Sequence, residues 1–279
     1  MKLLHLFWVS RPALWINTLG VAVTGLWLGG HLYTLDLRFW WVMLWLTLPF
    51  NLLIYGINDI YDQAEDALNP RKGGLQGARI YPEDVKLILW AVVLLNVPFV
   101  VYFCFVLPWQ ALLWMLFYAL IFVAYSARPI RFKARPYLDA ISNAAYAFPM
   151  AFVPLLMGSE VPWWALCGTM AWSVGKQAFD AIQDIPHDRK VGIVNTAVKL
   201  GVEGTMFWSA AWYTVAFLCF GQLSLLVALA VMLVNGRLLY KLHLNPTPAQ
   251  ARKLYPSSML SPLWIGTVAG VLLVASLVR

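Results

Sequence analysis

The sequence has few charged residues: Asp, Glu, Lys and Arg make up 12% of its 279 residues. A typical soluble domain carries about twice that fraction, roughly 25%. Hydrophobic residues make up 61% of the chain and aromatic residues 15%, and the mean hydropathy is +0.70. So little charge excludes an ordinary soluble domain. We therefore interpret the chain as an all-α polytopic membrane protein that forms a single transmembrane domain over residues 1–279.

Cysteine and histidine are also scarce. The three cysteines, Cys104, Cys167 and Cys219, lie inside apolar runs and show no paired spacing, and the four histidines are scattered. Neither a disulfide framework nor the ligand spacing of a zinc site is present. A function that depends on thiol or imidazole ligands is therefore not indicated.

Long apolar runs are what the sequence has instead. A membrane-spanning helix needs about 20 mainly apolar residues. Nine stretches are candidates, namely 12–30, 39–57, 86–107, 109–126, 138–158, 161–181, 205–220, 222–240 and 259–278. Short connections alternate with long polar ones, which are 58–85, 127–137, 182–204 and 241–258. We therefore expect a bundle of about nine transmembrane helices with all long polar loops on one face.

The basic residues are concentrated on the face of the long loops. Of the twenty Lys and Arg, only Arg38 and Arg279 fall on the opposite face, and Lys176 lies within a span. The positive-inside rule then predicts that the N-terminus and the long loops lie on the cytoplasmic side of a cell membrane. The net charge of +7 reflects this asymmetry, so we predict a lipid bilayer, and not nucleic acid, as the partner of the basic residues.

Two acidic motifs with matching spacing follow apolar runs on the predicted cytoplasmic face. The first is Asn58, Asp62 and Asp66, with Asp59 beside them, in "NDIYDQAED"; the second is Asp180, Asp184 and Asp188 in "DAIQDIPHD". The spacing i, i+4, i+8 places three side chains on one face of a helix. In the second motif, Pro186 leaves open an early end of the helix beyond Asp184.

Rows of carboxylates repel one another, and their cost rises near hydrocarbon. A cation is therefore expected to offset them. Hard oxygen ligands with open positions suit Mg²⁺, which binds one or two carboxylates and takes further ligands from substrate phosphates. Two such motifs facing each other would hold Mg²⁺ ions against a diphosphate. The alternative is a solvated acidic surface, which the duplication of pattern and position disfavours.

Basic residues near the motifs suit a phosphate ligand. They are Arg71 and Lys72 after the first motif, Arg189 and Lys190 after the second, and Arg128, Arg131, Lys133 and Arg135 in the loop "YSARPIRFKARP". For this loop, the ordinary excess of cytoplasmic basic residues is an equally good explanation.

These motifs resemble those of the UbiA superfamily of intramembrane prenyltransferases. The stretch "NDIYDQAED" matches the family pattern NDxxDxxxD, and "DIPHDRKVG" matches its second motif, DxxxD with a following Gly. The stretch "YSARPIRFK" is similar to its Tyr-Ser…Lys loop, and "SRPALW" to its N-terminal opening. Arg71 matches a basic residue that the family keeps after the first motif. The resemblance covers essentially the whole chain.

The resemblance implies a Mg²⁺-dependent enzyme that transfers an allylic prenyl group from a prenyl diphosphate to a hydrophobic acceptor. It implies as metal ligands Asn58, Asp59, Asp62, Asp66, Asp180, Asp184 and Asp188. Asp59 is expected behind the direct ligands, and in the second motif the pair that the family shares aligns with Asp184 and Asp188. The resemblance implies as diphosphate ligands Arg71, Lys72, Arg131 and Lys133. Asp62, Asp184, Lys133 and Tyr125 would act in the reaction, in which metal and cations stabilise the leaving diphosphate.

The choice of acceptor rests on longer stretches of sequence. "YGINDIYDQAEDALNPRKGG" and "AIQDIPHDRKVG" are most similar to the lycopene elongase branch of the family. That branch adds a prenyl unit from dimethylallyl diphosphate to the ends of lycopene, so the resemblance implies a carotenoid acceptor. Aromatic compounds, quinone precursors and other polyprenyl acceptors are the alternatives within the family.

Two alternatives belong to other classes of protein. A divalent-cation transporter usually has its carboxylates near the membrane midplane and within spans, whereas these motifs are expected at span ends beside arginines. A lipid phosphotransferase also needs Mg²⁺ and Asp residues, but it has one compact motif with an upstream pattern of small residues that this chain lacks.

Overall fold

The computed structural model describes residues 2–66 and 80–278, with side chains described for residues 4–63 and 80–278. Within these ranges the regular secondary structure is helical without strands, as the sequence predicts. The chain divides into two compact units. Unit 1 comprises Met1–Arg131 and Phe148–Val161, and unit 2 comprises Phe132–Ala147 and Pro162–Arg279. The organisation as one domain stays a prediction.

Five segments of the described ranges are long and apolar enough to cross a membrane. They are Leu37–Gln63, Asp84–Val106, Trp109–Ser126, Leu225–His243 and Pro248–Val278. The other predicted spans correspond to shorter or less apolar helices, one of which is Pro12–Leu28. These segments agree with a multi-pass membrane protein, and the total of nine spans stays a prediction.

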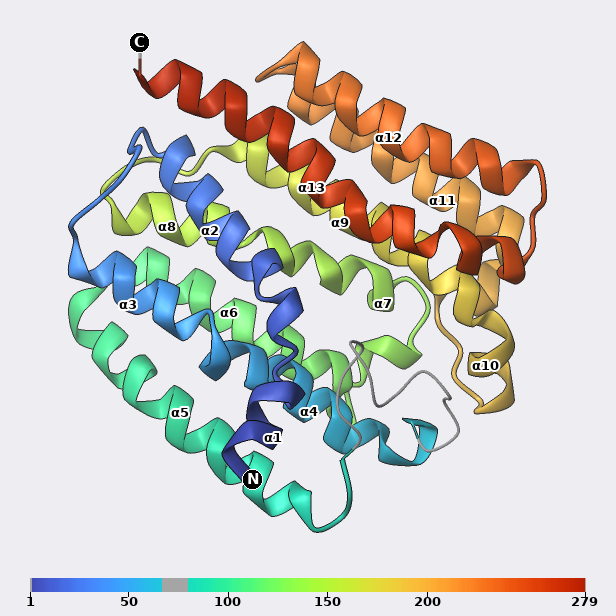
Figure 1. Cartoon of the computed structure of the whole chain (residues 1–279), viewed down its shortest axis with the longest axis horizontal. Helices are drawn as coiled ribbons and strands as arrows, with labels where there is room; N and C mark the ends of the chain where they lie inside the picture. Colours follow the sequence, from blue (N-terminus) through green and yellow to red (C-terminus); the bar gives the residue numbers. More distant parts are fainter. Residues whose placement is uncertain (1, 67–79, 279) are drawn as a thin grey trace. The chain divides into compact units, whose positions relative to one another are not determined.

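Unit 1 contains most helices of the N-terminal half of the chain (Figure 1). They are α1 (Lys2–Val9), η1 (Pro12–Leu14), α2 (Ile16–Leu28), α3 (Leu37–Trp45), α4 (Leu48–Asp66), α5 (Asp84–Val106), α6 (Trp109–Ser126) and α8 (Pro149–Leu156). Helix α2 packs closely on α8 because Gly25 has no side chain. A Cβ atom there would lie 2.8 Å from the carbonyl oxygen of Pro149.

Helix α3 begins at a charged cap. The Asp36 carboxylate accepts a hydrogen bond of 2.8 Å from the backbone N–H of Arg38, which satisfies one of the free donors at the helix start. Hydrogen bonds from the Arg38 side chain hold the pKa of Asp36 below its ordinary value. The cap therefore stays ionised at neutral pH.

The predicted span 39–57 is divided between α3 and α4. A break inside hydrocarbon leaves carbonyl groups that need a donor. The buried Asn51 supplies it, since its Nδ2 donates to the carbonyl oxygens of Leu46 over 2.7 Å and Thr47 over 3.0 Å. This side chain makes the interruption between α3 and α4 compatible with a membrane.

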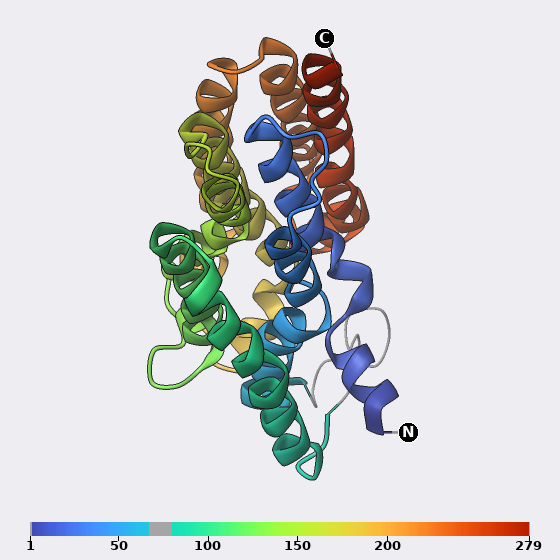
Figure 2. The same cartoon turned by 90° about the vertical axis from the view of Figure 1, so that its left-hand side faces the viewer.

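Unit 2 contains the helices of residues 132–147 and 162–279. They are η2 (Phe132–Ala134), α7 (Leu138–Ile141), η3 (Ser142–Ala147), α9 (Trp163–Ala181), η4 (Ile182–Asp184), α10 (Ile185–Lys190), α11 (Thr196–Gly221), α12 (Leu225–His243) and α13 (Pro248–Val278). Helix α11 packs against α9 and α12, and α12 packs against α13 (Figures 1 and 2). Gly175 lets α9 and α11 approach, because a Cβ atom there would lie 3.0 Å from the Tyr213 ring.

The predicted span 138–158 is not one helix. It is divided into α7, η3 and α8. The Nδ2 atom of Asn143 donates to the carbonyl oxygen of Asp139 over 2.9 Å, and Ser142 Oγ donates to the same oxygen over 3.3 Å. Such local side-chain bonds compete with the regular helical pattern and accompany its change to a 3-10 helix here.

Two segments that the sequence predicts as polar loops are partly helical. Residues 182–204 contain η4, α10 and the first turns of α11, and residues 241–258 contain the first turns of α13. Asn195 caps α11 by accepting a hydrogen bond from the N–H of Val198, and Pro248 is the first residue of α13. Good starting residues thus begin both helices before their apolar runs.

Candidate active site

The first acidic motif lies in the C-terminal half of α4, within unit 1. Asp59 is completely buried and Asp62 is 5% exposed. The Asn58 amide nitrogen Nδ2 donates to Asp62 Oδ2 over 2.8 Å and to Ser126 Oγ, at the end of α6, over 3.0 Å. The helical spacing therefore brings Asn58 and Asp62 together, as the sequence predicts.

Arg131 lies beside Asp62. The distance between Arg131 Nη2 and Asp62 Oδ1 is 3.7 Å, and both side chains are largely buried. Arg131 has a φ of 44°, a left-handed conformation that is uncommon outside glycine and is found at constrained functional positions. A guanidinium at this distance attracts the carboxylate. Arg131 thus stands where a cation of the site is needed.

Arg11 is a second cation at this motif. Its Nη2 donates to Asp59 Oδ1 over 2.7 Å, and its guanidinium lies 4.5 Å from the centre of the Tyr55 ring. Arg11 also has a left-handed φ, of 51°, directly before η1. Sequence reasoning missed this pairing, although Arg11 belongs to the "SRPALW" stretch that carried part of the resemblance.

The second acidic motif begins in α9 and continues over two further segments, all in unit 2. Helix α9 ends at Ala181, η4 covers Ile182–Asp184, and α10 begins at Ile185. Pro186 lies in the first turn of α10, where its missing N–H costs no helical hydrogen bond. The three carboxylates therefore do not share one continuous helical face, so that prediction is wrong, and the helix breaks before Pro186.

Asp180 is held by two side chains within unit 2. Lys176 Nζ, one turn earlier on α9, donates to Asp180 Oδ2. Ser258 Oγ, on α13, donates to Asp180 Oδ1 over 2.5 Å. The i, i+4 spacing of Lys176 and Asp180 was the available sequence signal for this pair. An apolar span thus contains an ion pair that neutralises both members.

Asp188 is fixed by the start of α11. Asn195 Nδ2 donates to Asp188 Oδ2 over 2.7 Å, while Asn195 Oδ1 accepts the N–H of Val198 over 2.9 Å. One amide therefore caps a helix and orients a carboxylate of the motif. Sequence reasoning missed Asn195, although an Asn before an apolar run is a common cap.

A buried network lies next to this cap. The Asp139 carboxylate accepts hydrogen bonds from the N–H of Thr196, over 3.1 Å, and from its hydroxyl. Thr196 Oγ1 in turn accepts the N–H of Tyr137 over 2.7 Å. Thr196 is completely buried and Asp139 is 2% exposed. The segment before α7 is thereby joined to the start of α11, one residue from Asn195.

The remaining predicted site residues are distributed over several elements. Tyr125 lies half-buried in the last turn of α6, Lys133 lies half-buried in η2, and Asp184 lies half-buried at the end of η4. Asp66 is the last residue of α4, but its side chain lies outside the described ones. Arg71 and Lys72 lie outside the described residues.

The donor atoms in both units suit Mg²⁺. Among the described side chains, no three His, Cys, Asp or Glu form a group that could hold a metal ion by themselves. Both hydrogen bonds of Asn58 use its Nδ2, so among the described residues its Oδ1 accepts none and is a hard oxygen donor near the Asp62 carboxylate. An incomplete set of hard oxygen donors fits an ion that completes its shell with substrate phosphates and water.

These features define a multi-pass helical membrane protein with carboxylates and arginines gathered at helix ends. The chain matches the model of the UbiA prenyltransferase family over residues 18–268. It belongs to this family and is a membrane prenyltransferase. The alternatives of a cation transporter and a lipid phosphotransferase lose their support.

Relatives with assigned names lie in one branch of the family. The lycopene elongase/hydratase of Corynebacterium glutamicum is 32% identical over 211 residues, which are 74% of this chain and 73% of that protein. The lycopene elongase/hydratase of Haloferax volcanii is 32% identical over 228 residues, which are 80% of this chain and 74% of that protein. The predicted resemblance to this branch is confirmed.

Solved structures share the fold at lower identity. A UbiA homolog from Archaeoglobus fulgidus bound to DMAPP and Mg²⁺ has a TM-score of 0.69 at 21% identity, covering 97% of this chain and 99% of that chain. The structure of a digeranylgeranylglyceryl phosphate synthase has a TM-score of 0.75 at 15% identity, covering 100% of this chain and 99% of that chain. These likenesses confirm the predicted helical membrane fold.

Proposed function

We propose that the protein transfers the five-carbon prenyl group of dimethylallyl diphosphate to the ends of lycopene, in a reaction that depends on Mg²⁺. The observation that carries this proposal is the identity of 32% with lycopene elongase/hydratases over about three quarters of the chain. The bound DMAPP and Mg²⁺ of the Archaeoglobus fulgidus homolog support the donor and the metal.

Each acidic motif supplies metal ligands from its own unit. Asn58, Asp62 and Asp66 supply ligands from the first motif, and Asp184 and Asp188 supply them from the second. When bound, Mg²⁺ neutralises charge on the diphosphate and stabilises it as a leaving group. Asn58 and Asn195 each hydrogen-bond one of the carboxylates, which fixes the orientation of Asp62 and Asp188 before substrate arrives.

Asp59 and Asp180 act indirectly, through hydrogen bonds with basic side chains. Each accepts a hydrogen bond from a basic side chain of its own unit, Arg11 for Asp59 and Lys176 for Asp180. An ion pair of this kind lowers the affinity of a carboxylate for a second cation. We therefore assign both residues to positioning and charge balance.

Basic residues contact the departing diphosphate. Arg131 is nearest to the metal ligands, since it lies 3.7 Å from Asp62. Asp62 would hold the metal ion, and the Arg131 guanidinium beside it would then bind the diphosphate oxygens. Lys133, with Arg71 and Lys72, extends the same role, and the Tyr125 hydroxyl contacts the diphosphate or helps to close the site.

The reaction itself needs few polar groups for the acceptor. The bond between C1 of the dimethylallyl group and oxygen breaks, and the electron pair leaves with the diphosphate. The terminal double bond of lycopene then forms a carbon–carbon bond with C1. The resulting cation loses a proton or takes up water. An apolar site suits both the acceptor and a short-lived carbocation, which aromatic faces stabilise.

Pigment analysis tests this proposal. The chain is expressed in bacteria that accumulate lycopene. The extracted pigments are separated, and their molecular masses are measured by mass spectrometry. We expect new carotenoids heavier than lycopene by one or two five-carbon units, with or without water. Unchanged lycopene together with prenylated quinone precursors contradicts the assignment of the acceptor. Unchanged lycopene without any prenylated product contradicts the proposal as a whole.

A further inference from the structure

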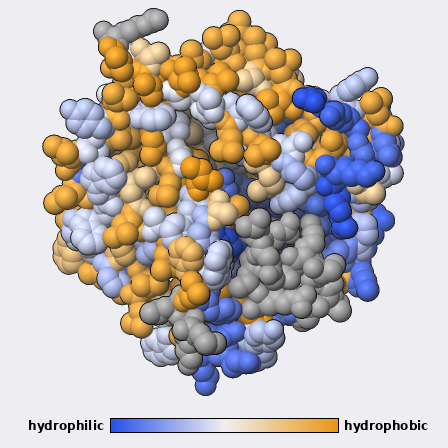
Figure 3. All heavy atoms as spheres, viewed as in Figure 1, coloured by the Kyte–Doolittle hydropathy of each residue, from blue (hydrophilic) through white to orange (hydrophobic). Residues whose placement is uncertain are grey.

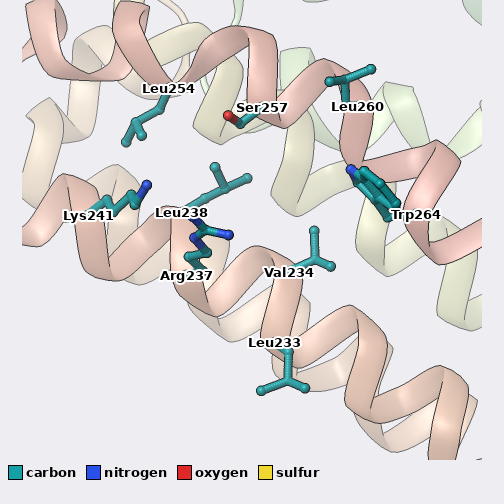
Figure 4. Close-up of a pocket in the computed structure, with 9 residues that line it drawn as sticks. All are labelled: Leu233, Val234, Arg237, Leu238, Lys241, Leu254, Ser257, Leu260 and Trp264. Atoms are coloured by element: carbon teal, nitrogen blue, oxygen red, sulfur yellow. The ribbon is translucent and has the colours of Figure 1, made fainter.

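A groove lies between α12 and α13 in unit 2, and none of the residues that line it belongs to an acidic motif. It has a volume of about 390 Å³. Its polar lining is Arg237 and Lys241 from α12 and Ser257 from α13, and its apolar lining includes Leu233, Leu260 and Trp264. Figure 4 shows the nitrogen ends of Arg237 and Lys241 directed into the space between the two helices, with Trp264 farther along α13. The groove therefore has a cationic part and an apolar part.

The two cations of the groove have no acidic counterpart nearby in the sequence. Residues 204–279 contain no Asp or Glu. Arg237 and Lys241 stand one turn apart, and neither side chain forms an ion pair or a hydrogen bond with another residue in the described part of the chain. Like charges at this spacing repel each other on a helix. A bound anion would offset that repulsion.

The apolar part of the groove is exposed on the surface of the unit. Leu233 is 70% exposed, Leu260 is 48% and Trp264 is 64%. Both helices are long and apolar enough to cross a membrane, so hydrocarbon covers these side chains. Figure 3 shows hydrophilic residues over the end of α12 and the beginning of α13, and hydrophobic residues along the rest of α13. The groove thus crosses from polar to apolar surface.

Arg237 lies near the C-terminal end of α12, within reach of the membrane interface. Helix α12 ends at His243, six residues beyond Arg237, which corresponds to about 9 Å along the helix. An arginine at this depth directs its guanidinium toward the interface. Basic pockets between membrane helices commonly bind anionic headgroups.

We propose that this groove binds one anionic glycerophospholipid. Its phosphate lies against Arg237, Lys241 and the hydroxyl of Ser257, and one acyl chain lies along Leu233, Leu260 and Trp264. The lipid covers apolar surface and also brings a negative charge to the two cations. A free phosphate does only the second, and a lipid without net charge does only the first. This inference is independent of the acceptor and donor assigned above.

Binding is measured on the purified, delipidated protein in neutral detergent. Dioleoylphosphatidylglycerol and dioleoylphosphatidylcholine are titrated separately, and bound lipid is counted by native mass spectrometry. The test variant is R237Q/K241Q. The matched control is R252Q/K253Q, which removes the same charge from exposed positions at the start of α13 that do not line the groove. Unchanged melting of both lipid-free variants confirms that they are folded.

We expect wild type and R252Q/K253Q to bind one phosphatidylglycerol with similar affinity, and R237Q/K241Q to bind it roughly tenfold to thirtyfold more weakly. We expect Trp264→Ala to weaken the binding of phosphatidylglycerol. The preference for this lipid over phosphatidylcholine should remain, because both cations are still present. Equal phosphatidylglycerol binding by wild type and R237Q/K241Q overturns the proposal. Equal binding of the two lipids by the wild type overturns it as well. If inorganic phosphate competes with the lipid at equal concentration, the groove is a simple phosphate site. That result also overturns the lipid proposal.

Discussion

The carboxylates of the two motifs differ in the partners that surround them. Asp62 is next to an amide and an arginine 3.7 Å away, whereas Asp59 is bonded directly to Arg11 and Asp180 to Lys176. Identical residues in one motif therefore have different capacities to bind a metal ion. The spacing in the sequence predicts which carboxylates come together, but it does not reveal a cation that comes from 48 residues away, as Arg11 does for Asp59.

Removal of a metal ligand should stop catalysis without unfolding the protein. We expect Asp62→Ala and Asp184→Ala to lower kcat by roughly 100-fold or more, the usual effect of removing a group that stabilises transition-state charge. Release of diphosphate from dimethylallyl diphosphate is the measurement, and recovery of the variants in the membrane fraction is the control. Substantial activity in either variant contradicts the metal assignment.

Removal of the Arg11 side chain should act mainly on stability. Asp59 has a side chain that is only 1% exposed, and breaking a buried ion pair from one side costs about 3 kcal/mol or more. We expect Arg11→Gln to lower the melting temperature in detergent clearly, and the double variant R11Q/D59N to recover part of the loss. A double variant no more stable than Arg11→Gln would show that the pairing is not the cause.

Short elements hold the second motif in place. The motif changes segment at Ala181 and again at Asp184, so the i, i+4, i+8 pattern did not describe its geometry. Hydrogen bonds of Asn195 to Asp188 and of Thr196 to Asp139, and not one continuous helix, hold this region in place. In the first motif the pattern holds for Asn58 and Asp62, which lie one turn apart on one helix and share a hydrogen bond. It failed in the second because a 3-10 turn changes the rotation per residue.

The hydroxyl of Thr196 should matter more than its size. Thr196→Val removes the donor to the buried Asp139 carboxylate and the acceptor of the Tyr137 N–H. Loss of a hydrogen bond to a buried charged group costs about 1.5–3 kcal/mol. We expect a lower melting temperature and a higher Mg²⁺ requirement, because Asn195 and Asp188 lose their support. Thr196→Ser keeps the hydroxyl and should behave like the wild type in both measurements.

At the scale of the whole molecule, composition was enough to predict a helical membrane protein. The apolar runs located most helices, but capping residues such as Asn195 began α11 nine residues before the predicted span at 205. The runs also gave no sign of the break inside 138–158, which depends on local bonds from Ser142 and Asn143. Hydropathy does not reveal the first turns of a helix that begins in polar sequence, because a capping residue and not an apolar run starts that helix.

The basic residues predict an orientation in the membrane that can be measured. We propose that the N-terminus and the turn between α12 and α13 lie in the cytoplasm. Single cysteines are introduced at Asn245, in that turn, and at Gln222, between α11 and α12, after the native cysteines are replaced by alanine. We expect a membrane-impermeant thiol reagent to label Gln222→Cys in intact cells, and to label Asn245→Cys only after the cells are opened. The reverse pattern contradicts the orientation.

We propose that this chain joins a dimethylallyl group to lycopene and releases diphosphate. The most direct measurement uses the purified protein in lipid vesicles that contain lycopene, with dimethylallyl diphosphate labelled at C1 and with Mg²⁺. We predict label in carotenoids heavier than lycopene, one diphosphate released for each group transferred, and neither product with Asp62→Ala or after chelation of Mg²⁺. Diphosphate release without labelled carotenoid, or labelled carotenoid that persists in Asp62→Ala, would contradict this account.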